Sequence, residues 1–159
     1  MNLDYSVTRP QEELQTLERF VCNQGKKFYA EKAIQDRLKL REPADVLYEG
    51  IEYQITYGDR ERLSERRKVM CNKGIYPAQI LSNQLSTYAD RLLRTALEDK
   101  KYKSHHEMIL LIDCMTTALH PFKAREAWCQ DYFRSDKENL GGFWKRLYVV
   151  FPDGNVQLR

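Results

Sequence analysis

The stretch from Asp45 to Thr56 most constrains the fold, because it reads as two short strands joined by a tight turn. Apolar and aromatic residues alternate imperfectly with the others on either side of Gly50, and the stretch is rich in β-forming residues, which indicates a β-hairpin with a glycine turn. Side chains two residues apart lie on one face of a strand, so we expect Glu52, Gln54 and Thr56 to share a face. Asp45, at the start of the neighbouring strand, is expected to approach them. The sequence therefore predicts a small polar cluster on a strand pair.

Helical segments are predicted on both sides of this hairpin. A capping box and apolar residues at helical spacing predict a first helix over about residues 9–24. A second apolar stripe predicts that helix continues through about residues 28–42, up to the break at Pro43. The most regular amphipathic pattern begins at Pro77 and ends near residue 100, and Pro121 begins another helix that reaches about Phe133.

The remaining strands are predicted from an apolar run and a turn motif. Residues 108–112 form an uninterrupted apolar run, which favours a strand buried on both faces of a sheet covered by helices. Near the end of the chain, Pro152-Asp153-Gly154 supplies turn residues between two β-rich segments and predicts a C-terminal β-hairpin. The expected fold class is thus α/β, a mixed sheet flanked by helices.

Length and composition bound the class of protein. With 159 residues, of which 42% are hydrophobic and 31% charged, one globular domain over residues 1–159 is expected. No apolar run approaches the ~20 residues that span a bilayer, and the first residues lack a signal-peptide pattern, so we expect a cytoplasmic protein without membrane contact. Reduced thiols are expected because no CxxC pair occurs among the cysteines, which are Cys22, Cys71, Cys114 and Cys129.

The hairpin resembles the core motif of a known enzyme superfamily. A predicted helix that ends before Pro43-Ala44-Asp45, followed by a strand carrying Gln54-Ile55-Thr56, is similar to the PD-(D/E)XK, or restriction-endonuclease-like, nucleases, and within them to an uncharacterised endonuclease branch. In that superfamily an Asp and a Glu or Gln bind a divalent metal, and a Lys two residues later orients the attacking water. The resemblance covers about residues 26–113. It implies that Asp45 and Gln54 hold Mg²⁺ or Mn²⁺, and that Thr56 stands where the family has Lys.

Two further features fit the same resemblance. The RecB-like branch carries a QxxxY element on the helix after the catalytic strands, which implies a role near the active site for Gln84 and Tyr88. The alternative is that Tyr88 packs in the core and Gln84 is incidental. Glu31 falls on the predicted helical stripe and matches the helical glutamate of many members; the alternative is a rim residue paired with Lys27 or Arg37.

Basic side chains form two groups that the resemblance places near nucleic acid. One group follows the hairpin within residues 58–68, and the other lies along and after the long helix. The expected nucleic-acid contacts are Arg60, Arg62, Arg66, Arg67, Lys68, Arg91, Lys100 and Lys101. For the first group the alternative is a solvated face of mixed charge, and for Lys100 and Lys101 it is the helix dipole. Arg91, Lys101 or Lys32 would replace the missing catalytic Lys.

Two functions are therefore expected as alternatives. The first is a divalent-metal-dependent nuclease that hydrolyses phosphodiester bonds with an atypical active site. The second is a nuclease-fold protein without catalysis that binds nucleic acid or a protein partner. The resemblance also favours DNA over RNA and implies a homodimer, for which the terminal hairpin or the first helix is the candidate interface. The net charge of +3 is too small to indicate nucleic-acid binding alone, and no P-loop, nucleophile elbow or HExxH motif is present.

Overall fold

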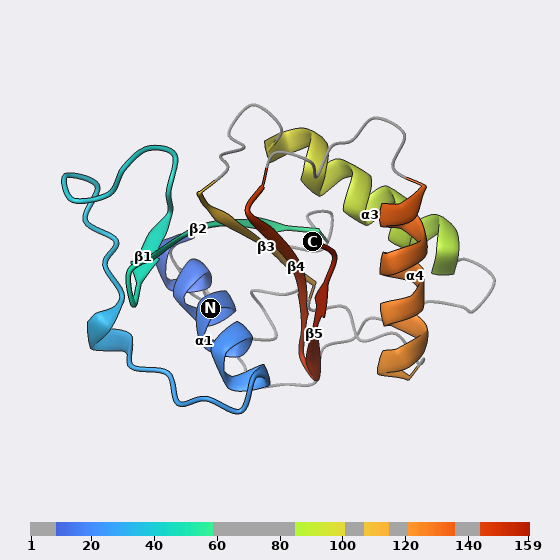
Figure 1. Cartoon of the computed structure of the whole chain (residues 1–159), viewed down its shortest axis with the longest axis horizontal. Helices are drawn as coiled ribbons and strands as arrows, with labels where there is room; N and C mark the ends of the chain where they lie inside the picture. Colours follow the sequence, from blue (N-terminus) through green and yellow to red (C-terminus); the bar gives the residue numbers. More distant parts are fainter. Residues whose placement is uncertain (1–8, 59–84, 101–106, 115–120, 136–143) are drawn as a thin grey trace, which may run out of the picture.

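A computed structural model describes residues 9–58, 85–100, 107–114, 121–135 and 144–159, with only the backbone described for residues 85–92 (Figure 1). In chain order the elements are α1 (Arg9–Asn23), η1 (Ala30–Lys32), β1 (Val46–Tyr48), β2 (Ile51–Tyr57), α3 (Leu85–Lys100), β3 (Ile109–Asp113), α4 (Phe122–Arg134), β4 (Arg146–Phe151) and β5 (Gly154–Gln157). None of the described helices is long and apolar enough to cross a bilayer.

The strands form one five-stranded mixed sheet in the order β1-β2-β3-β4-β5. The outer pairs β1–β2 and β4–β5 are antiparallel, whereas β2, β3 and β4 run parallel. Parallel neighbours require crossover connections, and α3 and α4 lie in these connections. All five residues of β3 are buried, which confirms the predicted central strand and agrees with its position between two parallel partners.

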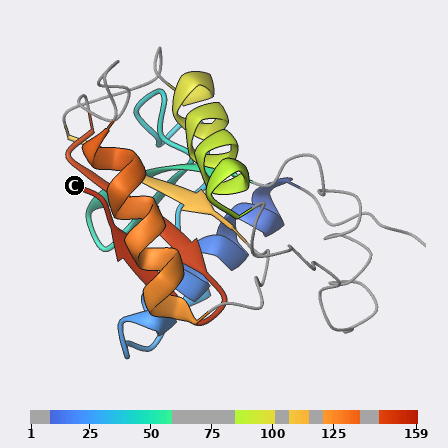
Figure 2. The ribbon, with the colours of Figure 1, turned by 90° about the vertical axis from the view of Figure 1, so that its right-hand side faces the viewer.

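Helices cover both faces of this sheet, as Figures 1 and 2 show. The face toward α1 carries a core that includes Leu17, Phe20 and Leu111. The opposite face packs against α3 and α4, with Leu97 and Trp144 among its fully buried side chains. The predicted mixed α/β sheet flanked by helices is therefore confirmed, and so is the C-terminal hairpin, which β4 and β5 form.

Polar contacts fix α1 to the sheet at two levels. Near its middle, Thr16 Oγ1 donates to the buried carboxylate of Asp113, and Arg19 Nη1 donates to the same Asp113 Oδ2 at 3.2 Å. At its end, Asn23 Nδ2 donates to Asn155 Oδ1 at 2.9 Å, and the Asn155 amide donates back to the Phe20 carbonyl at 2.9 Å. The helix thus has a fixed register against the strands.

The predicted hairpin at residues 45–56 is confirmed. The turn between β1 and β2 has positive φ at both central residues, 50° at Glu49 and 78° at Gly50. Two positive φ values are the geometry of a tight hairpin turn that matches the twist of the strands, and glycine adopts it without strain.

The helix predicted for residues 28–42 is wrong. Here the structure has only the short η1 and an irregular chain, and the Ile34 amide donates to the Leu47 carbonyl at 2.9 Å, with the reverse bond at the same distance. Leu38 is 96% exposed, so the apolar stripe does not mark a buried face. Pairing of Ile34 with the edge of β1 supplies the backbone hydrogen bonds that a helix would otherwise supply.

Candidate functional site

Four polar side chains near the junction of β1 and β2 are connected by hydrogen bonds or by charge, and we call them the acid–base cluster: Glu13, Asp45, Gln54 and Lys100. α1 contributes Glu13, the chain entering β1 contributes Asp45, β2 contributes Gln54, and the last residue of α3 is Lys100. Three of them are almost fully buried, at 3% exposure for Glu13, 1% for Gln54 and 4% for Lys100. Buried ionisable groups are rare without a partner or a function, so the cluster is the leading candidate for a site.

Lys100 and Gln54 are held by a continuous chain of hydrogen bonds. Lys100 Nζ donates to Gln54 Oε1 at 2.7 Å, and the Gln54 side-chain nitrogen donates to the Pro43 carbonyl. Both ends of the amide are therefore used, which fixes its orientation. The positive charge of Lys100 also acts on Glu13, whose pKa it lowers.

Asp45 is held by the backbone of β2. Its amide donates to the Tyr53 carbonyl at 2.8 Å, and its Oδ2 accepts a hydrogen bond from the Ile55 amide at 2.9 Å. The residue is only half-buried, in contrast to Glu13. This carboxylate therefore has a fixed position with access to solvent.

Glu13 has the most perturbed carboxyl group of the cluster. Burial raises its pKa from the ordinary 4.5 to about 7, and the negative charge of Asp45 adds to the increase. The positive charges of Arg9, Lys100 and Arg37 act in the opposite direction, with Arg9 Nε lying 3.8 Å from Glu13 Oε1. Near neutral pH the carboxyl is present in both its protonated and its ionised form.

A carboxyl with these properties is suited to proton transfer. A general acid or base is most effective when its pKa lies near the working pH, because both the proton-donating and the proton-accepting forms are then available. Asp45 and Lys100 place one negative and one positive group beside Glu13. Together the three groups can exchange a proton and stabilise charge on a bound molecule.

The structure brings together two of the residues that the sequence predicted as a metal and catalytic pair, Asp45 and Gln54. Thr56 follows on the same strand and is fully buried. Glu31 lies apart on η1, exposed to solvent. Of the QxxxY element, Tyr88 lies on α3 without a described side chain and Gln84 is outside the described residues, so their predicted roles stay predictions.

The described residues include only two of the predicted nucleic-acid contacts, Lys100 and Arg91. Lys100 is buried in the acid–base cluster, and for Arg91 the backbone on α3 is described. The others lie outside the described residues, namely Arg60, Arg62, Arg66, Arg67, Lys68 and Lys101. Within the described ranges, no group of three or more His, Cys, Asp and Glu side chains is placed to hold a metal ion, and Mg²⁺ or Mn²⁺ stays a prediction.

Sequence reasoning missed Glu13 and the pairing of Lys100 with Gln54. Glu13 falls four residues before Leu17 on the apolar stripe of the first helix, and Phe20 follows on the same side. An acidic residue in line with apolar ones was the signal applied to Glu31, and it was available here too. No sequence signal connected Lys100 to the hairpin.

Comparisons with known proteins identify a similar fold. No family model and no curated protein matches the chain. Among solved structures, the chain is similar to a protein of unknown function from Pseudomonas aeruginosa strain PAO1, described as a member of the monooxygenase superfamily. The TM-score is 0.54 at 19% identity, and the match covers 97% of this chain and 74% of the other. At this identity the likeness concerns the fold.

This finding corrects the resemblance to PD-(D/E)XK nucleases. The structure that the chain resembles along almost its whole length is described as a monooxygenase-superfamily protein, which points away from the expected metal-dependent hydrolysis of nucleic acid and from the nuclease-fold binding protein. The resemblance came from a few positions around one hairpin, a motif that many α/β sheets contain. On β2, the buried Thr56 occupies the position at which the nuclease family has its catalytic Lys.

Proposed function

We propose that the protein is an enzyme that moves a proton to or from a small bound substrate at the acid–base cluster, with Glu13 as the proton-transferring group. The observation that carries this proposal is the nearly complete burial of Glu13 beside Asp45 and Lys100, with a pKa of about 7. The similar structure is described as a monooxygenase-superfamily protein, which is compatible with an enzyme of this fold, whereas the proposed role follows from the residues of the cluster.

The other members of the cluster have supporting roles in this proposal. Lys100 stabilises negative charge that develops on the substrate when a proton is removed, and Gln54 holds the ammonium in place through the 2.7 Å hydrogen bond. Asp45, fixed by the Ile55 amide, raises the proton affinity of Glu13 through its negative charge. Its half-buried position marks the side from which a substrate approaches the cluster.

A generic proton-abstraction probe tests this role without knowledge of the natural substrate. Nitrobenzisoxazole loses its ring C–H proton to a base while its N–O bond breaks, which yields a coloured cyanophenolate. We expect the purified protein to accelerate this elimination, with a rate that rises with pH and levels off above about pH 7, where Glu13 is ionised. Glu13→Gln should lower the rate at least ~100-fold.

Glu18→Gln is the matched control, because it removes one negative charge from the exposed side of the same helix. It should keep the rate and its pH profile. The proposal is overturned if the protein gives no acceleration above buffer, or if Glu13→Gln and Glu18→Gln have the same rate. Circular dichroism of both variants verifies that the comparison is between folded proteins.

A further inference from the structure

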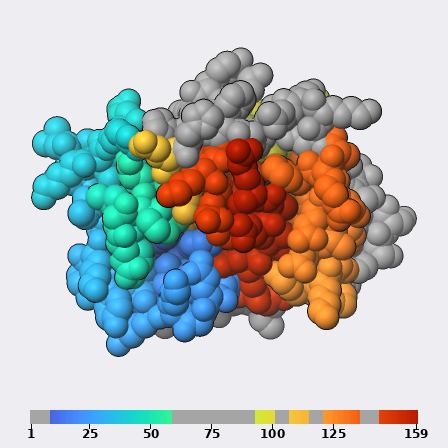
Figure 3. Space-filling model, viewed as in Figure 1, coloured from blue at the N-terminus to red at the C-terminus, as the bar shows by residue number. Residues whose placement is uncertain are grey.

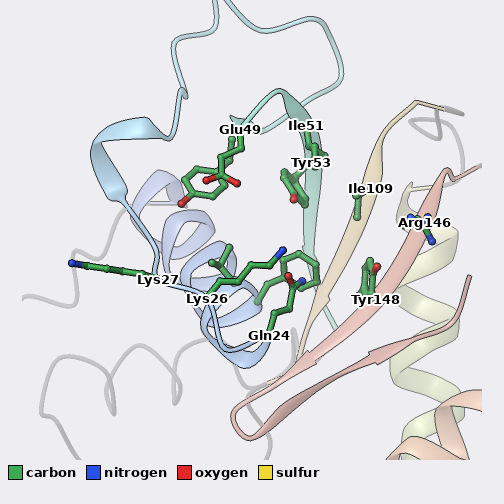
Figure 4. A pocket seen from close by; sticks show the side chains of 12 residues that line it. Gln24, Lys26, Lys27, Glu49, Ile51, Tyr53, Ile109, Arg146 and Tyr148 are labelled. Atoms are coloured by element: carbon green, nitrogen blue, oxygen red, sulfur yellow. The ribbon is translucent and has the colours of Figure 1, made fainter.

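A pocket lies on the α1 face of the sheet, at the end of α1 away from Glu13. Its volume is about 240 Å³. We call it the aromatic pocket, and the residues that carry the argument are Phe20, Lys26, Tyr53, Ile109, Arg146 and Tyr148. Figure 3 shows that the end of α1, the β1–β2 hairpin and β4 meet on one face of the molecule, and Figure 4 shows the pocket between them.

The register of the sheet explains why this pocket exists. Tyr53, Ile109 and Arg146 are direct neighbours across β2, β3 and β4, and form one row near the beginning of these parallel strands. α1 covers the later rows, because Thr16 and Arg19 are bonded to Asp113 at the end of β3. The last helical residue, Asn23, is bonded to the Phe151 carbonyl at the end of β4, so the helix does not cover the first row, which forms the floor of a recess.

Aromatic rings form the inner wall. The Phe20 ring lies 4.8 Å from the Tyr148 ring and 6.0 Å from the Tyr53 ring, both edge-to-face. Burial raises the pKa of Tyr53 to about 12, so its phenol stays neutral at physiological pH. A planar aromatic molecule in the pocket can therefore make stacked or edge-to-face contacts with these rings.

Positive charge dominates the rim. Three cationic side chains line the pocket, Lys26, Lys27 and Arg146, against one carboxylate, Glu49. In Figure 4 the Lys26 side chain extends into the pocket toward Tyr53 and Ile109, whereas Lys27 points away. In the described part of the chain, neither Lys26 nor Arg146 forms an ion pair, so both are available to a ligand.

We propose that the aromatic pocket binds a small aromatic carboxylate, with its ring against Phe20, Tyr53 and Tyr148 and its carboxylate held by Lys26 and Arg146. A recess of about 240 Å³ is smaller than the ~300–1,000 Å³ of sites for drug-sized ligands, so one or two rings fit. The guanidinium of Arg146 supplies the planar fork that suits a carboxylate. This site is distinct from the acid–base cluster and does not depend on the function proposed there.

Isothermal titration calorimetry with naphthoate tests the ligand class. Naphthoate should bind the wild-type protein more tightly than naphthalenemethanol, its neutral analogue, and naphthylmethylammonium should bind most weakly. Arg146→Gln and Lys26→Gln should each weaken naphthoate binding about 10-fold, as expected for loss of a charge-assisted hydrogen bond. Binding of the neutral analogue should change less than about 3-fold in the same variants, because it lacks the carboxylate.

Lys145→Gln is the matched control for charge, because Lys145 is the exposed sequence neighbour of Arg146 and does not line the pocket. It should leave naphthoate affinity unchanged. The proposal is overturned if wild-type protein does not bind naphthoate at millimolar concentration, if the neutral analogue binds equally well, or if Lys145→Gln weakens binding as much as Arg146→Gln. Glu13→Gln should bind naphthoate normally, which separates this test from that of the acid–base cluster.

Discussion

Lys100 Nζ lies 2.7 Å from Gln54 Oε1, and the two buried side chains join the end of α3 to the middle of β2. A buried ammonium would ordinarily be expected to face a carboxylate. The 2.7 Å bond to Gln54 gives it a neutral amide as one partner, and its positive charge lowers the proton affinity of Glu13. A charge on α3 therefore acts on a carboxyl group of α1, on the other side of the sheet.

Replacing Lys100 should change both the ionisation of Glu13 and the stability of the protein. In Lys100→Met the Glu13 carboxyl loses a positive neighbour, so its pKa should rise above about 7. Gln54 Oε1 also loses its donor, which should lower the free energy of unfolding by about 1–3 kcal/mol. Carbon-detected NMR titration of the Glu13 carboxyl and denaturant unfolding measure the two effects.

Arg94→Met is the control for this comparison, since it removes a positive charge from an exposed position on the same helix. The Glu13 titration should stay unchanged in that variant. A Glu13 pKa that is the same in Lys100→Met and Arg94→Met would contradict the electrostatic role given to Lys100.

The raised pKa of Glu13 predicts a pH dependence of stability with a definite sign. The folded protein holds the Glu13 proton up to about pH 7, whereas the unfolded chain releases it near 4.5. Between these values the folded state binds more protons, so the free energy of unfolding falls as pH rises. For a change from 4.5 to about 7 this contribution is at most about 3 kcal/mol.

Glu13→Gln should lack this contribution, because the amide resembles the neutral acid and does not titrate. Wild type and variant should have similar stability at pH 5, and at pH 8 the variant should be more stable by up to about 3 kcal/mol. Urea unfolding at a series of pH values, with Glu18→Gln in parallel, measures the difference. If wild type and Glu13→Gln differ in free energy of unfolding by the same amount at every pH in this range, Glu13 does not have a raised pKa in the folded protein.

The ion pair between Arg19 and Asp113 should matter much more than exposed ion pairs. Asp113 is fully buried and accepts from Arg19 at 3.2 Å. Arg19→Met removes this cation from beside the buried carboxylate and should lower the free energy of unfolding by about 3 kcal/mol. Arg134→Met breaks an exposed pair with Asp131 at 3.0 Å and should cost less than about 1 kcal/mol. Equal costs in urea unfolding would mean that Asp113 is not stabilised by Arg19.

Gly154 is required by a close contact, and Gly50 by its backbone conformation. A Cβ atom at Gly154 would lie 2.7 Å from the Phe122 ring, so Gly154→Ala should cost about 1–3 kcal/mol. Gly50 has nothing within 4 Å but a φ of +78°, so Gly50→Ala should cost about 1 kcal/mol through strain. Adding Phe122→Leu should reduce the penalty at Gly154 and not that at Gly50, as thermal unfolding of the double variants can show.

Much of the fold could be predicted because local patterns and tertiary structure agree. The hairpin at residues 45–56 combined alternation with a glycine turn, and the C-terminal hairpin had its own turn residues. The stretch 28–42 could not be predicted in this way. Its apolar spacing suits a helix, but the open edge of β1 offers hydrogen bonds to Ile34, and such a long-range pairing leaves no local signature.

The candidate site could be predicted only in part, for a related reason. Asp45 and Gln54 are near each other in the hairpin, so their proximity follows from strand geometry. Glu13 and Lys100 reach the same place from two helices on opposite faces, and only the packing of those helices brings them there. The nuclease resemblance was misleading because it included Asp45 and Gln54, which are close in the hairpin, and did not include the two helical residues.

The order of the strands has a consequence for how the protein assembles. Each strand pairs with its neighbour along the chain, whereas α1 is joined to the last hairpin by hydrogen bonds that span 128 and 135 residues. Contacts between distant residues carry the larger loop-closure cost, so the strands are expected to meet before α1 docks. Glu13 becomes buried only at that last step. We therefore expect this one carboxyl to take up its proton as α1 docks, at the end of folding.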